Sequence, residues 1–210
     1  MIVYSDDLAG QGIENTKRYF VPQSKIDLSL LATWLTTCEA HHGTACGEKK
    51  FAAAGVGGNG ILLVDLKDIC IVQSTLEARY CCLSYVWGNM DQLELTQEAR
   101  VVFQQPGALD ARMDQIPQTI RDTMKVVKGL GERYLWVDCL CIVQDDEAQR
   151  KTQLAQMAAT YGSALLTVVA VASPDVNSPL PGVAHCTRRP DVLGSTGRLT
   201  FAIEPINSSA

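Results

Sequence analysis

The sequence predicts an α/β fold in which helices cover both faces of a parallel sheet. Three β-rich runs, near 81–86, 134–139 and 165–171, are apolar almost throughout, which is typical of strands buried on both faces. Helical patterns near 117–130 and 147–161 separate these runs, and the connections are short. Strands that alternate with helices in this way pair in parallel through right-handed crossovers, so the helices are expected on both faces of the sheet.

An N-terminal helix and a β-hairpin are expected to extend this core. Asp27 can cap a helix that ends near Ala40, because apolar residues recur behind it at helical spacing: Leu28, Leu31, Leu35 and Cys38. A loop rich in glycine follows. The run 61–73 then reads ILLVDLKDICIVQ, which predicts a hairpin that turns around Leu66, Lys67 and Asp68.

The two helices of the core carry signals at their ends. The first has Pro117 in its first turn and Gly131 at its C-terminal cap, and the second begins at a capping box of Asp146 and Gln149. Apolar residues recur along both helices at helical spacing. We expect four of them to be buried against the sheet: Met124, Val127, Leu154 and Met157.

Composition divides the chain into three parts. Residues 1–60 are expected to hold the N-terminal helix and the Gly-rich loop, and residues 61–182 the α/β core. After Ser173 the chain is rich in Pro, Gly, Ser and Asn, so 183–210 is expected to be irregular, with one candidate strand at 198–205.

Charge and hydropathy exclude several functions. The formal net charge is −5 and Lys and Arg form no run, so we expect neither nucleic acid nor a membrane as partner. The N-terminus lacks the pattern of a signal peptide, and the longest apolar run is far shorter than the roughly 20 residues that cross a bilayer. A cytoplasmic location is therefore expected.

The eight cysteines lack the density of a disulfide framework, and we expect most to be reduced and buried.

Polar and aromatic residues follow two strands where those strands are expected to end. In an open parallel sheet, ligands bind outside the carboxyl ends of the strands. The sequence therefore predicts a ligand or interaction edge formed by Ser84, Tyr85, Trp87, Asp138, Cys141 and Asp145. A purely structural role remains open for several of these residues: Asp138 can accept bonds from loop amides, Asp145 and Asp146 can cap a helix, and Trp87 can belong to the core.

Two motifs suggest cofactors but lack the necessary context. Gly55, Gly57 and Gly60 match the letters of a dinucleotide motif, yet they precede a strand where that motif must follow one. Cys38, His42 and Cys46 have a spacing that suits zinc, but a structural site needs a fourth ligand. We therefore expect no cofactor and no stoichiometric zinc, with zinc on these three residues as the alternative.

Four blocks resemble, in order and spacing, those of the fungal heterokaryon incompatibility (HET) domain. The blocks are LSYVWG (83–88), IPQTIRD (116–122), YLWVDCLCIVQDD (134–146) and MAATYGSA (157–164). The segments WLTTCEAHHGTAC and ILLVDLKDICIV are also similar to the region that precedes these blocks. The resemblance covers 27–182 and implies a role in nonself recognition between fungal strains, which leads to programmed cell death.

The resemblance also implies a flavodoxin-like fold akin to the Toll/interleukin-1 receptor (TIR) domain. Some TIR domains hydrolyse NAD with a glutamate, and HET proteins commonly carry a comparable Arg-x-Trp-Thr-x-Gln-Glu block downstream. This chain has no such block, and Glu204 lies in a different context, so we expect a truncated chain that is inactive as a hydrolase. Three roles remain: a cell death signalling domain, a TIR-like NAD hydrolase at the sheet's carboxyl edge, and a non-enzymatic assembly module that binds other proteins, like domains included.

Overall fold

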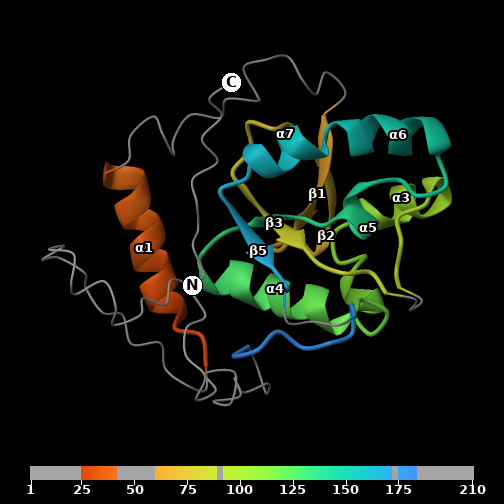
Figure 1. Ribbon diagram of the computed structural model, residues 1–210. Helices are drawn as coiled ribbons and strands as arrows, with labels where there is room; N and C mark the ends of the chain where they lie inside the picture. The colour runs from red at the N-terminus through yellow and green to blue at the C-terminus, as the bar shows by residue number, and fades with distance from the viewer. Residues whose placement is uncertain (1–24, 42–59, 89–91, 172–174, 184–210) are drawn as a thin grey trace, which may run out of the picture.

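The computed structural model describes residues 25–41, 60–88, 92–171 and 175–183, and these form an open five-stranded sheet with packed helices (Figure 1). The strands are β1 (Ile61–Asp65), β2 (Cys70–Ser74), β3 (Tyr80–Ser84), β4 (Tyr134–Trp136) and β5 (Leu166–Val169). The helices are α1 (Leu28–His41), α3 (Gln97–Phe103), η2 (Asp110–Arg112), α4 (Gln118–Gly129), α5 (Asp138–Cys141), α6 (Glu147–Ala155) and α7 (Met157–Gly162). The predicted α/β class is confirmed. The candidate strand at 198–205 lies outside the described residues, as does most of the Gly-rich loop.

The sheet is mixed, so the prediction of a parallel sheet is only partly right. Its order is β2-β1-β4-β3-β5. Strand β3 pairs in parallel with β4 and β5, as predicted, whereas β1 pairs antiparallel with both β2 and β4. The hairpin is thus part of the main sheet. The reason is burial: all five residues of β1 are buried, and a strand that is apolar on both faces is stable inside a sheet.

The turn of the hairpin is clamped by a buried aspartate. Asp65 accepts hydrogen bonds from the backbone amides of Lys67 (2.9 Å) and Asp68 (3.2 Å). Arg133, just before β4, binds the same carboxylate through Nε (3.0 Å) and Nη2 (2.6 Å). Burial raises the pKa of Asp65, but the bonds from Arg133 and the turn amides outweigh it and hold that pKa below its ordinary value. The clamp fixes the hairpin against the start of β4.

The crossover helices lie on opposite faces of the sheet. The chain passes from β3 through α4 to β4, and then through α5, α6 and α7 back past β3 to β5. Parallel crossovers are right-handed, so two crossovers that run in opposite directions put their helices on opposite faces. Side-chain contacts confirm that α7 packs on one of these faces. The Tyr80 hydroxyl donates to the Thr160 carbonyl of α7 at 2.6 Å, and the rings of Trp136 and Tyr161 pack edge to face.

The predicted burial of the helices is half right. Met124 and Val127 of α4 are buried as expected. The run 147–161, however, forms two helices, because α6 ends at Ala155 and α7 begins at Met157. The break changes the direction of the apolar face. Leu154 is consequently 50% exposed, contrary to the prediction, and Met157 is only partly buried.

Strand β4 is shorter than its predicted range. It ends at Trp136, and Asp138 begins the four-residue helix α5. The apolar residues Cys139 and Leu140 are buried in that helical turn. Periodicity does not distinguish a short buried helix from a buried strand, which is why the sequence predicted a longer strand here.

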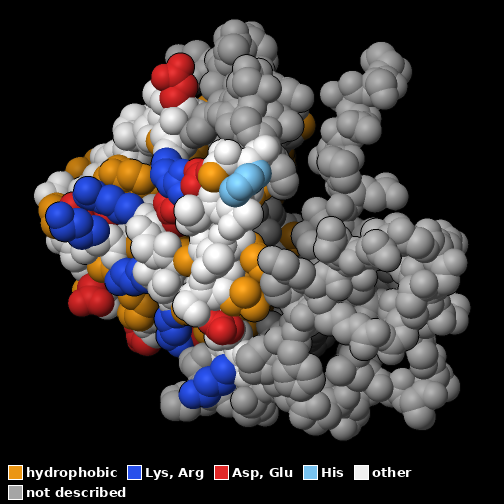
Figure 2. Space-filling model, turned by 90° about the vertical axis from the view of Figure 1, so that its left-hand side faces the viewer, with side chains coloured by type: hydrophobic (Ala, Val, Ile, Leu, Met, Phe, Trp, Pro, Cys, Tyr) orange, Lys and Arg blue, Asp and Glu red, His pale blue; other side chains and the backbone are white. Residues whose placement is uncertain are grey.

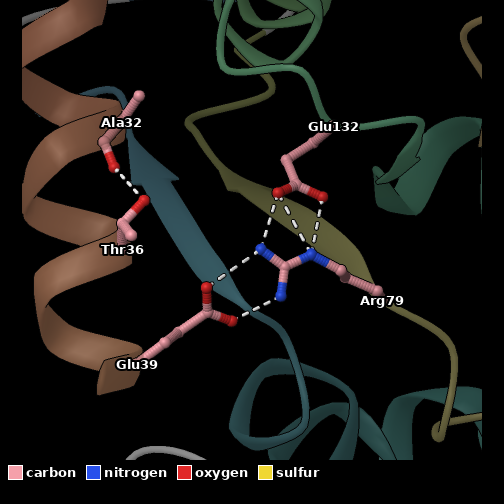
Figure 3. A network of polar contacts seen from close by, with 5 residues as sticks. All are labelled: Ala32, Thr36, Glu39, Arg79 and Glu132. Carbon is pink, nitrogen blue, oxygen red and sulfur yellow. Dashed lines mark hydrogen bonds and ion pairs between the residues drawn. The ribbon is translucent and has the colours of Figure 1, made fainter. Parts of the chain in front are cut away.

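Helix α1 packs against the core at its first residue and is joined to two other segments by ion pairs. The helix is where the sequence predicts it; none of its residues is fully buried, although Leu28 of the predicted apolar stripe packs against the core. Arg79, just before β3, binds Glu39 of α1 and Glu132, which precedes β4, and thereby joins three segments (Figure 3). In Figure 1 α1 stands apart from the sheet, and Figure 2 shows basic and acidic side chains interspersed on this side of the molecule.

Residues 175–183 return to buried polar groups on α4. Asp122 accepts a hydrogen bond from the Leu180 amide at 3.1 Å, and the Thr119 hydroxyl donates to the Ser178 carbonyl at 2.6 Å. Both side chains are fully buried. The sequence analysis missed this attachment, because it assigned α4 only an apolar stripe. Among the described residues, no helix is long and apolar enough to cross a membrane.

Candidate functional site

The carboxyl ends of β3 and β4 lie side by side at a switch point of the topology. The two strands are neighbours in parallel register, with Cys82 opposite Trp136. The chain leaves β3 toward α4 and leaves β4 toward α7, that is, toward opposite faces of the sheet. Doubly wound folds bind their ligands at such a point of divergence. The fold therefore marks the same edge that the sequence analysis singled out.

A tryptophan and an aspartate bridge this switch point. The indole Nε1 of Trp87, beyond β3, donates to Oδ2 of Asp138 at 2.7 Å. The other carboxylate oxygen, Oδ1, accepts the Cys139 amide at 2.8 Å, and the Gln144 side chain donates to the Asp138 carbonyl at 3.0 Å. Both oxygens of Asp138 thus have partners. The arrangement positions the carboxylate and joins two sequence blocks that lie about fifty residues apart.

Burial shifts the pKa of the Asp138 carboxyl and of its neighbour Tyr85. Desolvation raises the pKa of Asp138 above its ordinary value, although the hydrogen bond from Trp87 acts in the opposite direction. Desolvation also raises the pKa of the Tyr85 hydroxyl, and the nearby Cys139 and Asp138 add to that effect. Tyr85 therefore stays protonated, and its hydroxyl donates to Gln92 at 3.3 Å.

The other predicted site residues are placed around this pair. Ser84 ends β3, and its carbonyl accepts the Ala170 amide at 2.9 Å. Cys141 is the last residue of α5, and burial raises the pKa of its thiol to about 12, so the thiol is neutral. Asp145 accepts the Gln97 amide at the start of α3 (2.9 Å), and Asp146 caps α6 through the Gln149 amide (2.9 Å). The two acidic residues thus have the capping role that the sequence left open.

The zinc alternative is only partly covered by the described residues. Cys38 lies on α1 and is partly buried, whereas His42 and Cys46 fall outside the described residues. Within the described ranges, no three His, Cys, Asp or Glu side chains form a group that could hold a metal ion. The expected absence of zinc stays a prediction.

A hollow that the sequence analysis missed opens elsewhere on the same edge. It has a volume of about 260 Å³ and lies between the start of β1, the end of β2, α3 and α6. Its polar lining residues are Gln73, Arg100, Gln149, Thr152 and Gln153. No motif could have revealed it, because these residues come from separate elements that only the antiparallel insertion of β1 brings together.

Fold and site together define an α/β domain with a switch-point edge built from separated sequence blocks. Residues 80–198 match the family model described as heterokaryon incompatibility protein (HET), which is more than half of the chain. The chain therefore belongs to the HET family, as its sequence blocks predicted. No curated protein and no solved structure matched it.

Proposed function

We propose that this chain is a signalling domain of fungal nonself recognition that promotes programmed cell death by binding other proteins, like domains included. Family membership supports the setting, since the HET match includes the whole switch-point edge. On this proposal the domain acts in the cytoplasm of fungal cells. The edge itself suggests how the signal passes on.

Three exposed valines at the carboxyl ends of the strands are the observation that favours a protein partner. Val86 follows β3 and is 56% exposed, and Val169 and Val171 at the end of β5 are 58% and 78% exposed. Val169 lies opposite Ser84 in the β3–β5 register, and Val86 and Val171 follow two residues further along each chain segment, so all three positions are at the same end of these strands. Exposed apolar groups that gather at one place are typical of interaction sites.

The geometry at Asp138 favours binding over hydrolysis. Both oxygens of Asp138 accept hydrogen bonds from the protein, and the bond from Trp87 joins two segments, which supports a positioning role for this carboxylate. We therefore place the NAD hydrolase second, as the alternative. Incubation of the purified chain with NAD should release no nicotinamide above a protein-free control. Turnover that Asp138→Asn abolishes in a folded protein would make the chain an enzyme.

Growth of fungal cells that express the chain tests the signalling role. We expect induction to slow growth, and Val169→Lys to relieve the effect, because a charge at the centre of an apolar contact opposes association. Val101→Lys is the matched control, since Val101 is also a highly exposed valine but lies on α3, which contacts β2 at the other end of the strand order. Equal growth with and without induction, or equal relief by both variants, would contradict the proposal.

A further inference from the structure

The hollow beside α6 has the position of a ligand site but lies apart from the switch point. Strand β1 runs antiparallel to β4, so its first residues reach the edge where the parallel strands end. There Leu62 lies opposite Gln73, near the end of β2, and α6 forms the other wall. The hollow is thus at the ligand-binding edge of the sheet, on the far side of β4 from β3.

The charge of the hollow favours an anion. Among the described residues that line it, Arg100 is the charged one, and no carboxylate shares the wall. Cys141 also borders the hollow, and its thiol is neutral, because burial raises its pKa to about 12. The other polar groups are neutral amides and a hydroxyl, which can donate or accept hydrogen bonds.

Hydrogen bonds orient the side chains of this wall. Arg100 donates from Nη2 to Gln73 Oε1 at 3.2 Å, and Gln73 donates from Nε2 to the Ile61 carbonyl at 3.4 Å. A guanidinium has five N–H donors in a planar fork, so one bond to Gln73 fixes its direction and still allows it to bind an oxyanion. On the opposite wall, Gln153 donates to the Gly60 carbonyl at 3.5 Å.

Glycine at position 60 keeps the backbone close to this wall. Its φ of +70° is disfavoured for other residues, and a Cβ there would meet Gln73 Nε2 and the Ser74 carbonyl at 2.6 Å. The peptide of Gly60 can therefore border the hollow directly. A volume of about 260 Å³ is below the usual range for drug-sized ligands, roughly 300–1,000 Å³, so the ligand must be compact.

We propose that this hollow binds a small oxyanion-bearing molecule. Its phosphate or carboxylate lies on Arg100, and its neutral polar groups contact the side-chain amides of Gln149 and Gln153 on α6. The site goes beyond the signalling role and does not depend on it. A failure of the growth experiment would leave this proposal standing, and a failure to bind an oxyanion would leave the signalling role standing.

Titration of the ¹⁵N-labelled full chain with inorganic phosphate, ribose 5-phosphate and succinate tests the site by NMR. We expect saturable shifts at the backbone amides of Gly60, Ile61 and Gln149 with at least one probe. The two phosphates and the dicarboxylate distinguish the two oxyanion sources. Shifts that map elsewhere, or no saturable shift with any probe, would overturn the proposal.

Three variants make this test specific. Arg100→Gln should weaken binding about tenfold or more, because it removes the charge-assisted bond. Ala148→Phe keeps every charge but fills the hollow from an exposed position on α6, and it should also abolish binding. Lys151→Gln removes one positive charge from the exposed side of the same helix and should change nothing. Undiminished binding to Ala148→Phe, or to a folded Arg100→Gln, would count against the site.

Discussion

The amino and carboxyl ends of the parallel strands differ in how their charged side chains are paired. At the amino ends of β3 and β4, Arg79 and Arg133 each bind two carboxylates, so charges of opposite sign meet there. At the carboxyl ends, Asp138 is held by the neutral indole of Trp87, and Arg100 lines a hollow without an acidic group on its wall. The first edge stabilises the scaffold, and the second presents groups whose charge is not matched.

The two aspartates show the same contrast in their response to pH. The pKa of Asp65 is lowered, so its ionised form stabilises the fold, and this stability is lost as pH falls from the ordinary value of 3.8 through the lowered pKa. The pKa of Asp138 is raised, so stability is instead lost as pH rises from 3.8 through its pKa in the fold. Ionisation of Asp65 at the amino ends of the strands thus stabilises the fold, whereas burial opposes the ionisation of Asp138 at the carboxyl ends.

Asp65→Asn should give the largest effect. It removes charge-assisted bonds from Arg133 while Asn keeps the size of the side chain, and we expect a loss of about 1.5–3 kcal/mol in the free energy of unfolding. Urea denaturation at neutral pH measures it. The variant should also show a flatter decline of stability below pH 4 than the wild type. An unchanged unfolding midpoint would show that the clamp does not stabilise the hairpin.

Trp87→Phe should have a smaller effect, confined to the carboxyl edge. It leaves Oδ2 of Asp138 without the indole bond, and we expect a loss of about 1–2 kcal/mol in the free energy of unfolding. The pKa of Asp138 should rise further, which NMR of the carboxyl carbon can follow. Trp34→Phe on α1 is the matched control. If Trp87→Phe leaves the pKa of Asp138 unchanged, as the control should, the Trp87 bond does not influence that pKa.

Arg79→Gln should barely change global stability, because the Arg79 side chain is 50% exposed. We expect a loss of about 0.5–1 kcal/mol, which is the usual range for exposed ion pairs. The local effect should be larger: amide exchange in α1 should speed up, since no residue of α1 is buried. High salt should do the same to the wild type. Unaltered exchange in α1 would show that other contacts hold this helix.

Lys151→Gln should give the smallest effect. Its ion pair with Glu147 joins side chains that are 72% and 73% exposed, and it should contribute less than about 0.5 kcal/mol. Thermal unfolding beside Arg79→Gln compares an isolated pair with a three-segment network. A larger loss from Lys151→Gln than from Arg79→Gln would show that the network adds nothing to a single exposed pair.

Local patterns predicted most of the elements but not the way in which one of them pairs. The strands β3, β4 and β5, the helix α4 and the hairpin were visible as apolar runs and caps, because these signals depend on near neighbours in the chain. The pairing of β1 with β4 was not visible. Hairpin formation fixes only the partner β2, and the second partner depends on which buried edge is available.

The candidate site shows the same division. The sequence placed Trp87 and Asp138 at strand ends, and the parallel alternation implied that these ends meet. It could not show that both oxygens of Asp138 are occupied, nor that Leu154 faces solvent, because each depends on a bond or a bend made at packing distance.

The sequence by itself determined the α/β class, the parallel direction of β3, β4 and β5, and membership of the HET family. These features follow from periodicity, caps and ordered blocks, which are written in consecutive residues. Only the tertiary structure decided the antiparallel place of β1, the ion pairs of Arg79 and Arg133, and the hollow beside Arg100. Each of these joins residues far apart in the chain, and their free energy depends on burial and distance, which no local pattern specifies.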